Sequence, residues 1–388
     1  MRIALFASVV FLTACATTAP EPLVMPPSAE IPPPAAEAMV AAPAVKNAAL
    51  AKFYDDYDKA ELALSPLAKS YRAIKDEDYA KLDQFGEDAA LANRALDQAT
   101  AEAMQAQYDR AALNSDDQLS YDLLLYRNTR AASIFPYRRN AYVFDQMNGA
   151  QADIPAFLIN IHKVDSEADA RAYIGRIGET GRFIDQAVAE AVEREKSGVL
   201  PPRWVFPQVI EQSKNIISGA PFDKSADNDL FADFKTKVAK LAIAPAAKAS
   251  LVADARAAMT GTMAPAYRRM IALLGAQAKR AGTDDGIWRF KDGAAQYAAL
   301  LKFYTTTDLD GDQVHALGLA QVARIHGEMT AIKDQVGFAG TLKQFFAHVR
   351  DGKQFYYPNT AAGKQSYLDD QGRGAGRRRV AALFRPSA

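Results

Sequence analysis

Cysteine is nearly absent from this chain, since Cys15 is the only one among 388 residues. One cysteine can form neither an intramolecular disulfide nor a cysteine-rich zinc site. An excess of charge is also lacking, because 46 Lys and Arg balance 46 Asp and Glu. This balance argues against nucleic acid as the main partner, since nucleic-acid-binding domains usually present a basic face. The composition is 49% hydrophobic and 24% charged, as in a globular protein, so function must be read from local motifs.

The first fifteen residues predict a lipoprotein signal. Residues 1–14 pair an early arginine with a short apolar run, which is too short to span a bilayer and is typical of a signal peptide. The sequence Leu12–Cys15 resembles a bacterial lipobox, in which the cysteine is acylated and becomes the mature N-terminus. Cys15 is therefore the predicted lipid attachment, with an ordinary secretory signal as the alternative. Because Ala16 follows it and not Asp, we expect the outer membrane, with the protein facing the periplasm.

The next segment, residues 15–45, is predicted to be a proline-rich tether. It contains eight of the 19 prolines in the chain. Proline has no backbone N–H and favours extended polyproline geometry, so such a segment acts as a semi-rigid spacer. No later stretch reaches 18 apolar residues, so we expect the lipid to be the membrane attachment of this chain.

From residue 46 to residue 370 the apolar spacing is three and four, which predicts an all-α body, an irregular array of ten or more helices. Ser166 begins the clearest helix and Gly198 ends it. A second helix, with a stripe of apolar residues, is bounded by a capping box at Asp310 and by Gly337. The remaining predicted helices are Ala48–Leu64, Glu77–Gln84, Asp88–Ala111, Asp116–Arg130, Val205–Ile217, Asp227–Leu241, Ala247–Ala278 and Thr341–Val349.

Residues for catalysis or metal binding do not form a recognisable motif. The four histidines never occur at the i, i+4 spacing with an intervening Glu that a zinc peptidase helix needs. His315 and His326 share a helix stripe but lie ~16 Å apart along its axis, too far to bind one ion. The acids at 308, 310 and 312 lack the Gly and Glu of a calcium loop, so they are interpreted as helix-capping residues. We therefore predict no catalytic residue, no metal ligand and no cofactor in this chain.

Several segments, taken in their order along the chain, resemble the bacterial "domain of unknown function 885" family. They are Tyr173–Ile177, Gly198–Arg203 with the following residues 209–217, Tyr304–Thr307, and Val314–Leu319 with Glu328 and Met329. The resemblance covers residues 48 to 370. It implies a fold similar to the zincin-type peptidases, of which this chain matches the N-terminal half. In longer relatives, a C-terminal helix with the pattern His-Glu, three residues, Gly-His is expected to hold zinc, and peptides are the expected substrates.

No residue of this chain matches those zinc ligands, so no catalytic role is carried over. His315 does match a family position, and the resemblance implies a cleft-facing role for it; the alternative is a histidine that caps or packs a helix. The resemblance thus predicts a lipid-anchored envelope protein that is inactive alone and leaves enzymatic activity open. The alternative function is a non-catalytic helical binding or scaffold lipoprotein.

Residues 371–388 differ in composition from the rest of the chain. They contain five Arg and no Lys or acid, which suggests a frameshift within a longer gene; a genuine basic tail is the alternative. If half of a globule is missing, we expect helices of the remaining half to expose a contiguous apolar patch above ~600 Å². Assembly with a separately encoded second half is a further hypothesis.

Overall fold

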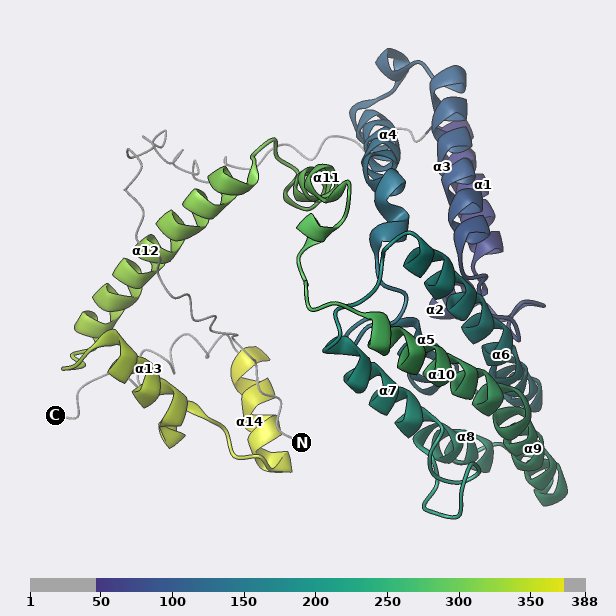
Figure 1. The fold of residues 1–388 in the computed structure, drawn as a ribbon. Coiled ribbons are helices and arrows are strands. Elements are labelled where there is room, and N and C mark those ends of the chain that lie inside the picture. The colour runs from purple at the N-terminus through teal and green to yellow at the C-terminus, as the bar shows by residue number, and fades with distance from the viewer. Residues whose placement is uncertain (1–46, 373–388) are drawn as a thin grey trace. The chain divides into compact units, whose positions relative to one another are not determined.

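The computed structural model describes residues 47–372, and helices are its regular elements (Figure 1). Within that range there is no strand, and an isolated bridge pairs Ala220 with Asp227. The prediction of an all-α array of ten or more helices is confirmed. The predicted signal peptide, Cys15, the tether and the tail from residue 373 lie outside the described residues.

Fourteen α-helices lie in the described range, and none of them has the length and hydropathy of a membrane span. They are α1 (Ala48–Leu64), α2 (Pro66–Tyr71), α3 (Glu87–Gln107), α4 (Ser115–Ile134), α5 (Ala150–Asn160), α6 (Glu167–Lys196), α7 (Val205–Ile216), α8 (Asp229–Ala239), α9 (Pro245–Ala258), α10 (Ala264–Arg280), α11 (Gly293–Thr305), α12 (Gly311–Gln335), α13 (Leu342–Asp351) and α14 (Ala361–Gly372).

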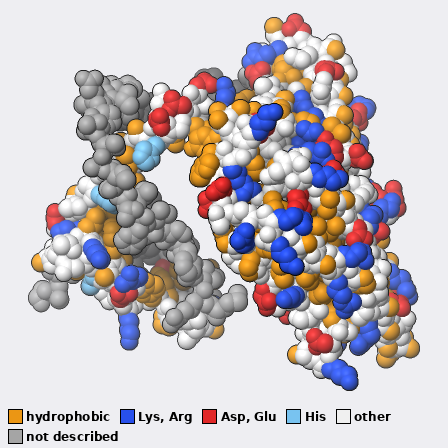
Figure 2. Space-filling view, viewed as in Figure 1, with side chains coloured by type: hydrophobic (Ala, Val, Ile, Leu, Met, Phe, Trp, Pro, Cys, Tyr) orange, Lys and Arg blue, Asp and Glu red, His pale blue; other side chains and the backbone are white. Residues whose placement is uncertain are grey.

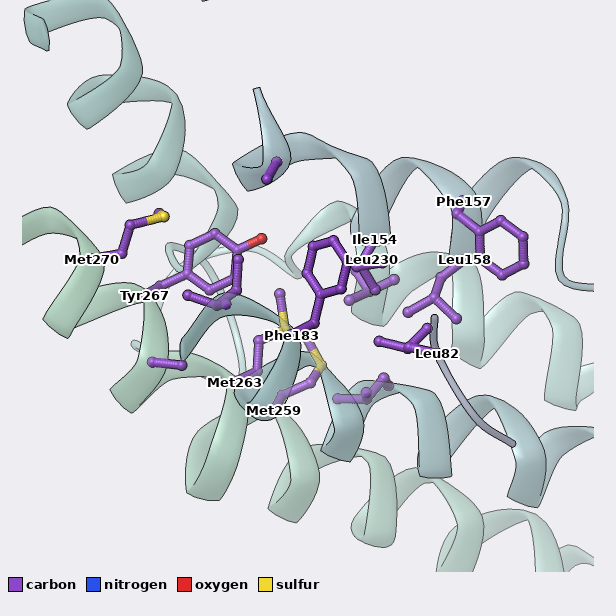
Figure 3. Close-up of a cluster of buried hydrophobic side chains, with 14 of the residues drawn as sticks. Leu82, Ile154, Phe157, Leu158, Phe183, Leu230, Met259, Met263, Tyr267 and Met270 are labelled. Carbon is purple, nitrogen blue, oxygen red and sulfur yellow. The ribbon is translucent and has the colours of Figure 1, made fainter. Parts of the chain in front are cut away.

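The main hydrophobic core is built by α5 to α10 around α6. The apolar stripe of α6 explains its central place, because Tyr173, Ile177 and Ile184 are fully buried on it. In Figure 3, Phe183 of α6 lies among Met259, Met263 and Tyr267, while Phe157 and Leu158 of α5 lie further along the same core. Fully burying each large apolar side chain contributes about 1.5–3 kcal/mol, so this core holds the bundle together.

A smaller apolar cluster joins α1, α3 and α4. Its buried members are Leu50, Met104 and Tyr121, one from each helix. α11 packs on α4, and the guanidinium of Arg130 on α4 lies 4.1 Å from the centre of the Phe303 ring. These N-terminal helices therefore have a core of their own, separate from the cluster around α6.

The ends predicted for α6 and α12 agree with the structure, whereas those predicted at Ala111 and Arg130 lie four residues from the observed ends at Gln107 and Ile134. The Ser166 hydroxyl accepts a hydrogen bond from the Asp169 N–H at 3.1 Å and so caps α6. Gly198 follows α6 with a φ of +82°, a left-handed conformation that favours glycine. Asp310 and Gln313 form the capping box that begins α12. Local side-chain chemistry was sufficient to locate these ends.

The predicted helix at Glu77–Gln84 is wrong, because this segment forms a turn followed by irregular chain. Its carbonyl groups accept hydrogen bonds from arginine side chains of α6. Arg176 donates to the Lys81 carbonyl at 2.9 Å, and Arg182 donates to the Leu82 and Asp83 carbonyls at 3.1 and 3.2 Å. Tertiary hydrogen bonds therefore replace the helical ones that the local pattern predicts.

The single helix predicted at Ala247–Ala278 contains a π-helical turn at Met259–Met263, between α9 and α10. This turn places Met259 and Met263 together in the core, with 0% and 1% of their surface exposed. The short helices α2, α5, α11 and α14 were not predicted. α5 has no polar face to reveal it, since apolar residues occur on all sides of this 11-residue helix.

Candidate functional site

α12 carries an apolar surface that no other part of the described chain buries. None of the 25 residues of this helix is buried. Five of its larger apolar side chains are between 37% and 58% exposed, whereas Val314 and Met329 are half-buried. We call these five side chains the α12 surface: Leu317, Leu319, Val322, Ile325 and Ile332. A run of exposed apolar side chains along one helix is typical of an interaction surface.

The helices after α12 also expose large apolar side chains. Phe346 of α13 is 43% exposed, and Tyr367 and Leu368 of α14 are 49% and 59% exposed. Phe345 of α13 is buried and packs on Phe338, with ring centroids 5.3 Å apart. This region is therefore folded by small local clusters and also exposes several large apolar side chains.

His315 lies in the second turn of α12 and its side chain is exposed. No hydrogen bond or ion pair involves its ring within the described residues. His326 is exposed on the same helix. A cleft-facing role for His315 therefore stays a prediction, and its place on α12 makes it part of the same exposed helix as the α12 surface.

A metal centre does not form among the described residues, where no group of three His, Cys, Asp or Glu side chains could hold an ion. The acids considered for calcium are engaged otherwise. Asp308 pairs with Lys302 at 2.6 Å, and Asp310 accepts a hydrogen bond from the Gln313 N–H at 2.9 Å. The helix-capping interpretation is thus confirmed for Asp310.

The most unusual polar group is Arg176, whose side chain is fully buried on α6. Its guanidinium donates to the carbonyl of Lys81 at 2.9 Å, the carbonyl of Pro66 at 3.2 Å and the hydroxyl of Ser70 at 2.8 Å. It also contacts His162 Nδ1 at 2.9 Å. All four partners are neutral, so burial lowers the pKa of Arg176 to about 10, and it remains charged at neutral pH.

This guanidinium fixes the protonation of His162. Arg176 can only donate, so Nδ1 of His162 accepts and its proton lies on Nε2, which donates to the Asp169 carbonyl at 3.2 Å. The ring stacks on Tyr79 with centroids 4.4 Å apart. Burial, together with the positive charge of Arg176, lowers the pKa of His162 to about 3. His162 is therefore a neutral structural histidine, held away from solvent.

Sequence reasoning missed the Arg176–His162 pair. A signal was present, because Arg176 interrupts an apolar stretch between Ile174 and Ile177 on a helix whose neighbouring positions are buried. The arrangement ties α2 and the chain after it to α6. It has no access to solvent, so we assign it a role in positioning these segments and none in chemistry.

The surface of the bundle is otherwise mixed in charge. In Figure 2, basic and acidic side chains alternate over the face of the molecule that is shown, with apolar side chains between them. Fold and site together define an all-helical protein. Its main bundle has a large hydrophobic core and the buried side chain of Arg176, and its long helix α12 has exposed apolar side chains.

Comparison with known proteins identifies the family. The profile of DUF885, described as "Bacterial protein of unknown function", matches residues 66–376, so the chain belongs to this family. No curated protein sequence matches the chain.

A solved structure shares the fold. It is "the putative lipoprotein from Colwellia psychrerythraea", which is similar to this chain with a TM-score of 0.69 and 20% sequence identity. The match covers 83% of this chain and 57% of that one. This chain thus spans less than two thirds of the length of that relative.

Proposed function

We propose that this protein is a lipid-anchored protein of the bacterial envelope and that the α12 surface receives a second polypeptide part. In this proposal the described helices are the N-terminal half of a fold similar to the zincin-type peptidases, and peptides are the substrate of the whole. The exposed α12 surface carries the proposal, because a long helix with apolar side chains in water is otherwise unfavourable.

The length of the relative supports this proposal. The match leaves 43% of the Colwellia chain uncovered (100% minus 57%), and that remainder is polypeptide of the same molecule. The covering part is therefore proposed to be a segment equivalent to that remainder, supplied on the same chain or separately.

In this proposal, the second part supplies the zinc ligands. The described residues do not fit a zinc site, since no three suitable side chains converge in them. No chemical step is assigned to a residue of this chain. Peptidase activity is expected only where the second part brings the ligands.

The membrane attachment rests on the lipobox-like sequence at Leu12–Cys15. The acyl chains on Cys15 would anchor the protein, and Ala16 after it favours the outer membrane, with the body in the periplasm. Labelled fatty acid should be incorporated into the chain in a bacterial host and lost in the Cys15→Ser variant. Labelling that persists in this variant would contradict lipid attachment at Cys15.

A fusion protein tests whether a second polypeptide part covers the α12 surface. Joining the uncovered remainder of the Colwellia protein after residue 370 should bury the α12 surface and reduce binding of a hydrophobic dye. Ile325→Glu in the fusion should restore dye binding, since it places a charge in the buried contact. Ala331→Glu is the matched control, because Ala331 is exposed and lies three or four positions from none of the five side chains of the α12 surface.

Two results would overturn this reading. One is dye binding that the fusion leaves unchanged. The other is stoichiometric zinc with chelator-sensitive peptidase activity in the present chain alone, since that would require a metal site without the second part.

The alternative function is a non-catalytic binding or scaffold lipoprotein. The α5–α10 bundle favours it, because this bundle has a complete core of its own and a surface groove beside α5. Under this alternative the chain alone binds its ligand, and adding the second part does not change the affinity for that ligand.

A further inference from the structure

A groove of about 510 Å³ opens between α2, the chain that follows it, α5 and α6. Small-molecule sites in proteins usually measure ~300–1,000 Å³ and are mainly apolar, so this groove has a suitable size. No residue of α12 lines it. One of its rings, that of Phe157, also lies 5.0 Å from the buried guanidinium of Arg176.

Aromatic rings form the walls of this groove. Tyr71 of α2 and Phe157 of α5 meet edge to face, with centroids 5.7 Å apart. Phe85 and Phe183 of α6 meet in the same way at 5.3 Å. Tyr71 is 65% exposed, so its ring is available at the mouth of the groove. Such rings attract flat apolar groups and organic cations.

Both charged side chains that line the groove are acids, and no Lys, Arg or His lines it. Asp83 is already engaged, since it accepts hydrogen bonds from the Ser65 hydroxyl at 2.6 Å and the Leu67 N–H at 2.9 Å. Asp153 of α5 has no hydrogen bond or ion pair with another described residue. Its side chain reaches solvent, yet the apolar surroundings and the nearby Asp145 raise its pKa.

A second hollow of about 430 Å³ shares Gln84 and Phe85 with the groove, and its four charged lining residues are acids. Three of these acids are paired with bases, namely Glu87 with Arg138, Glu190 with Arg194 and Glu193 with Lys196. Within the groove itself, an anion would meet the carboxylate of Asp153. A cation would gain the unpaired carboxylate of Asp153 as a partner without displacing an existing one.

We propose that the groove between α2, α5 and α6 binds a small organic cation, with its apolar body between the aromatic rings and its ammonium group beside Asp153. Charge complementarity selects the cation, and the volume of the groove selects a small molecule. This inference is independent of the second part proposed for α12.

Calorimetric titration with three probes of similar shape tests this assignment. They are 2-phenylethylammonium, the neutral 2-phenylethanol and the anion 3-phenylpropionate. The cation should bind about tenfold more tightly than the alcohol, as expected for a hydrogen bond to a charged group. The anion should bind least of the three.

Variants locate the site. Asp153→Asn should weaken binding of the cation about tenfold, to the level of the alcohol, and Tyr71→Ala should weaken both probes severalfold. Asp254→Asn is the matched control, because Asp254 is an exposed acid of α9 outside the groove, and it should leave binding unchanged. Circular dichroism of each variant confirms that the fold is kept.

Three outcomes would overturn the assignment. They are equal binding of the cation and the alcohol, an Asp153→Asn variant that binds the cation as tightly as the unmodified protein, and the absence of saturable binding by the cation. If the dipeptide N-acetyl-Phe-Arg-amide binds and 2-phenylethylammonium does not, the occupant is a basic peptide and the small-molecule assignment is wrong.

Discussion

The two longest helices of the described chain, α6 and α12, have similar sequence signals and opposite environments. Both begin at a capping residue, and both carry apolar residues at intervals of three and four. Twelve of the 30 residues of α6 are buried, whereas none of the 25 residues of α12 is. An apolar stripe therefore predicts that a helix forms, but it does not say which surface covers that helix.

The difference also separates two sources of helix stability. α6 is held by packing, through side chains such as Ile177 and Tyr173, and by the Arg176 hydrogen bonds. α12 depends on local interactions, such as its capping box and the ion pair of Arg324 with Glu328 four residues later. A cap contributes about 1 kcal/mol and an i,i+4 ion pair a few tenths of a kcal/mol, so α12 gains far less stability than α6 does from its buried side chains.

Hydrogen exchange should show the largest contrast. Amides in the middle of α6 should exchange only on global unfolding, which typically requires 5 kcal/mol or more, whereas α12 opens locally. We expect α6 to exchange about a thousandfold or more slowly than α12, as measured by mass spectrometry of peptides from each helix. Equal protection would mean that α12 is covered in solution by a surface that the described residues do not provide.

Arg176→Met should destabilise the bundle by about 4 kcal/mol. Four buried acceptors lose their donor, and each unsatisfied buried group costs about 1–3 kcal/mol. Urea denaturation followed by circular dichroism measures this change. Arg171→Met on the same helix is the control and should stay within about 0.5 kcal/mol, because that side chain is 57% exposed. Similar values for the two variants would show that the buried network contributes little.

Truncating one isoleucine on each helix sharpens the comparison further. Ile177→Ala on α6 should cost about 3 kcal/mol, since it removes a fully buried side chain and leaves a cavity. Ile332→Ala on α12 should cost less than about 1 kcal/mol, because this side chain is 51% exposed. The same urea titrations test both variants. A large loss for Ile332→Ala would contradict an exposed α12 surface.

The smallest expected effect is the pH dependence that His162 gives to the bundle. Burial lowers its pKa from 6.5 to about 3, so the folded protein excludes a proton that the unfolded chain accepts. Stability is therefore fully present above pH 6.5 and declines as pH falls toward 3, by about 2 kcal/mol between pH 7 and pH 5.

Urea titrations at a series of pH values measure this loss. His162→Gln should reduce the slope, while His326→Gln should keep it, because the ring of His326 is exposed on α12. If His162→Gln left the slope unchanged, another group would be responsible for the pH dependence.

Some parts of the fold were beyond sequence reasoning for identifiable reasons. Glu77–Gln84 has a helical pattern, but its carbonyl groups bond to Arg176 and Arg182 from a helix about a hundred positions away. The groove could not be predicted for the same reason, because its walls come from α2, α5 and α6, which lie far apart in the sequence. Asp153 shows no motif around it and becomes a candidate ligand only when the aromatic walls are in place.

The sequence alone determined that the body is helical, where its best-capped helices begin and end, and that no metal-binding motif is present. These properties depend on neighbours within a few positions, where side-chain spacing and capping chemistry act directly. Only the tertiary structure decided that Arg176 is buried, that α12 stays exposed and that a groove opens beside α5. Burial depends on which distant segments meet, and a one-dimensional pattern of apolar residues does not contain that information.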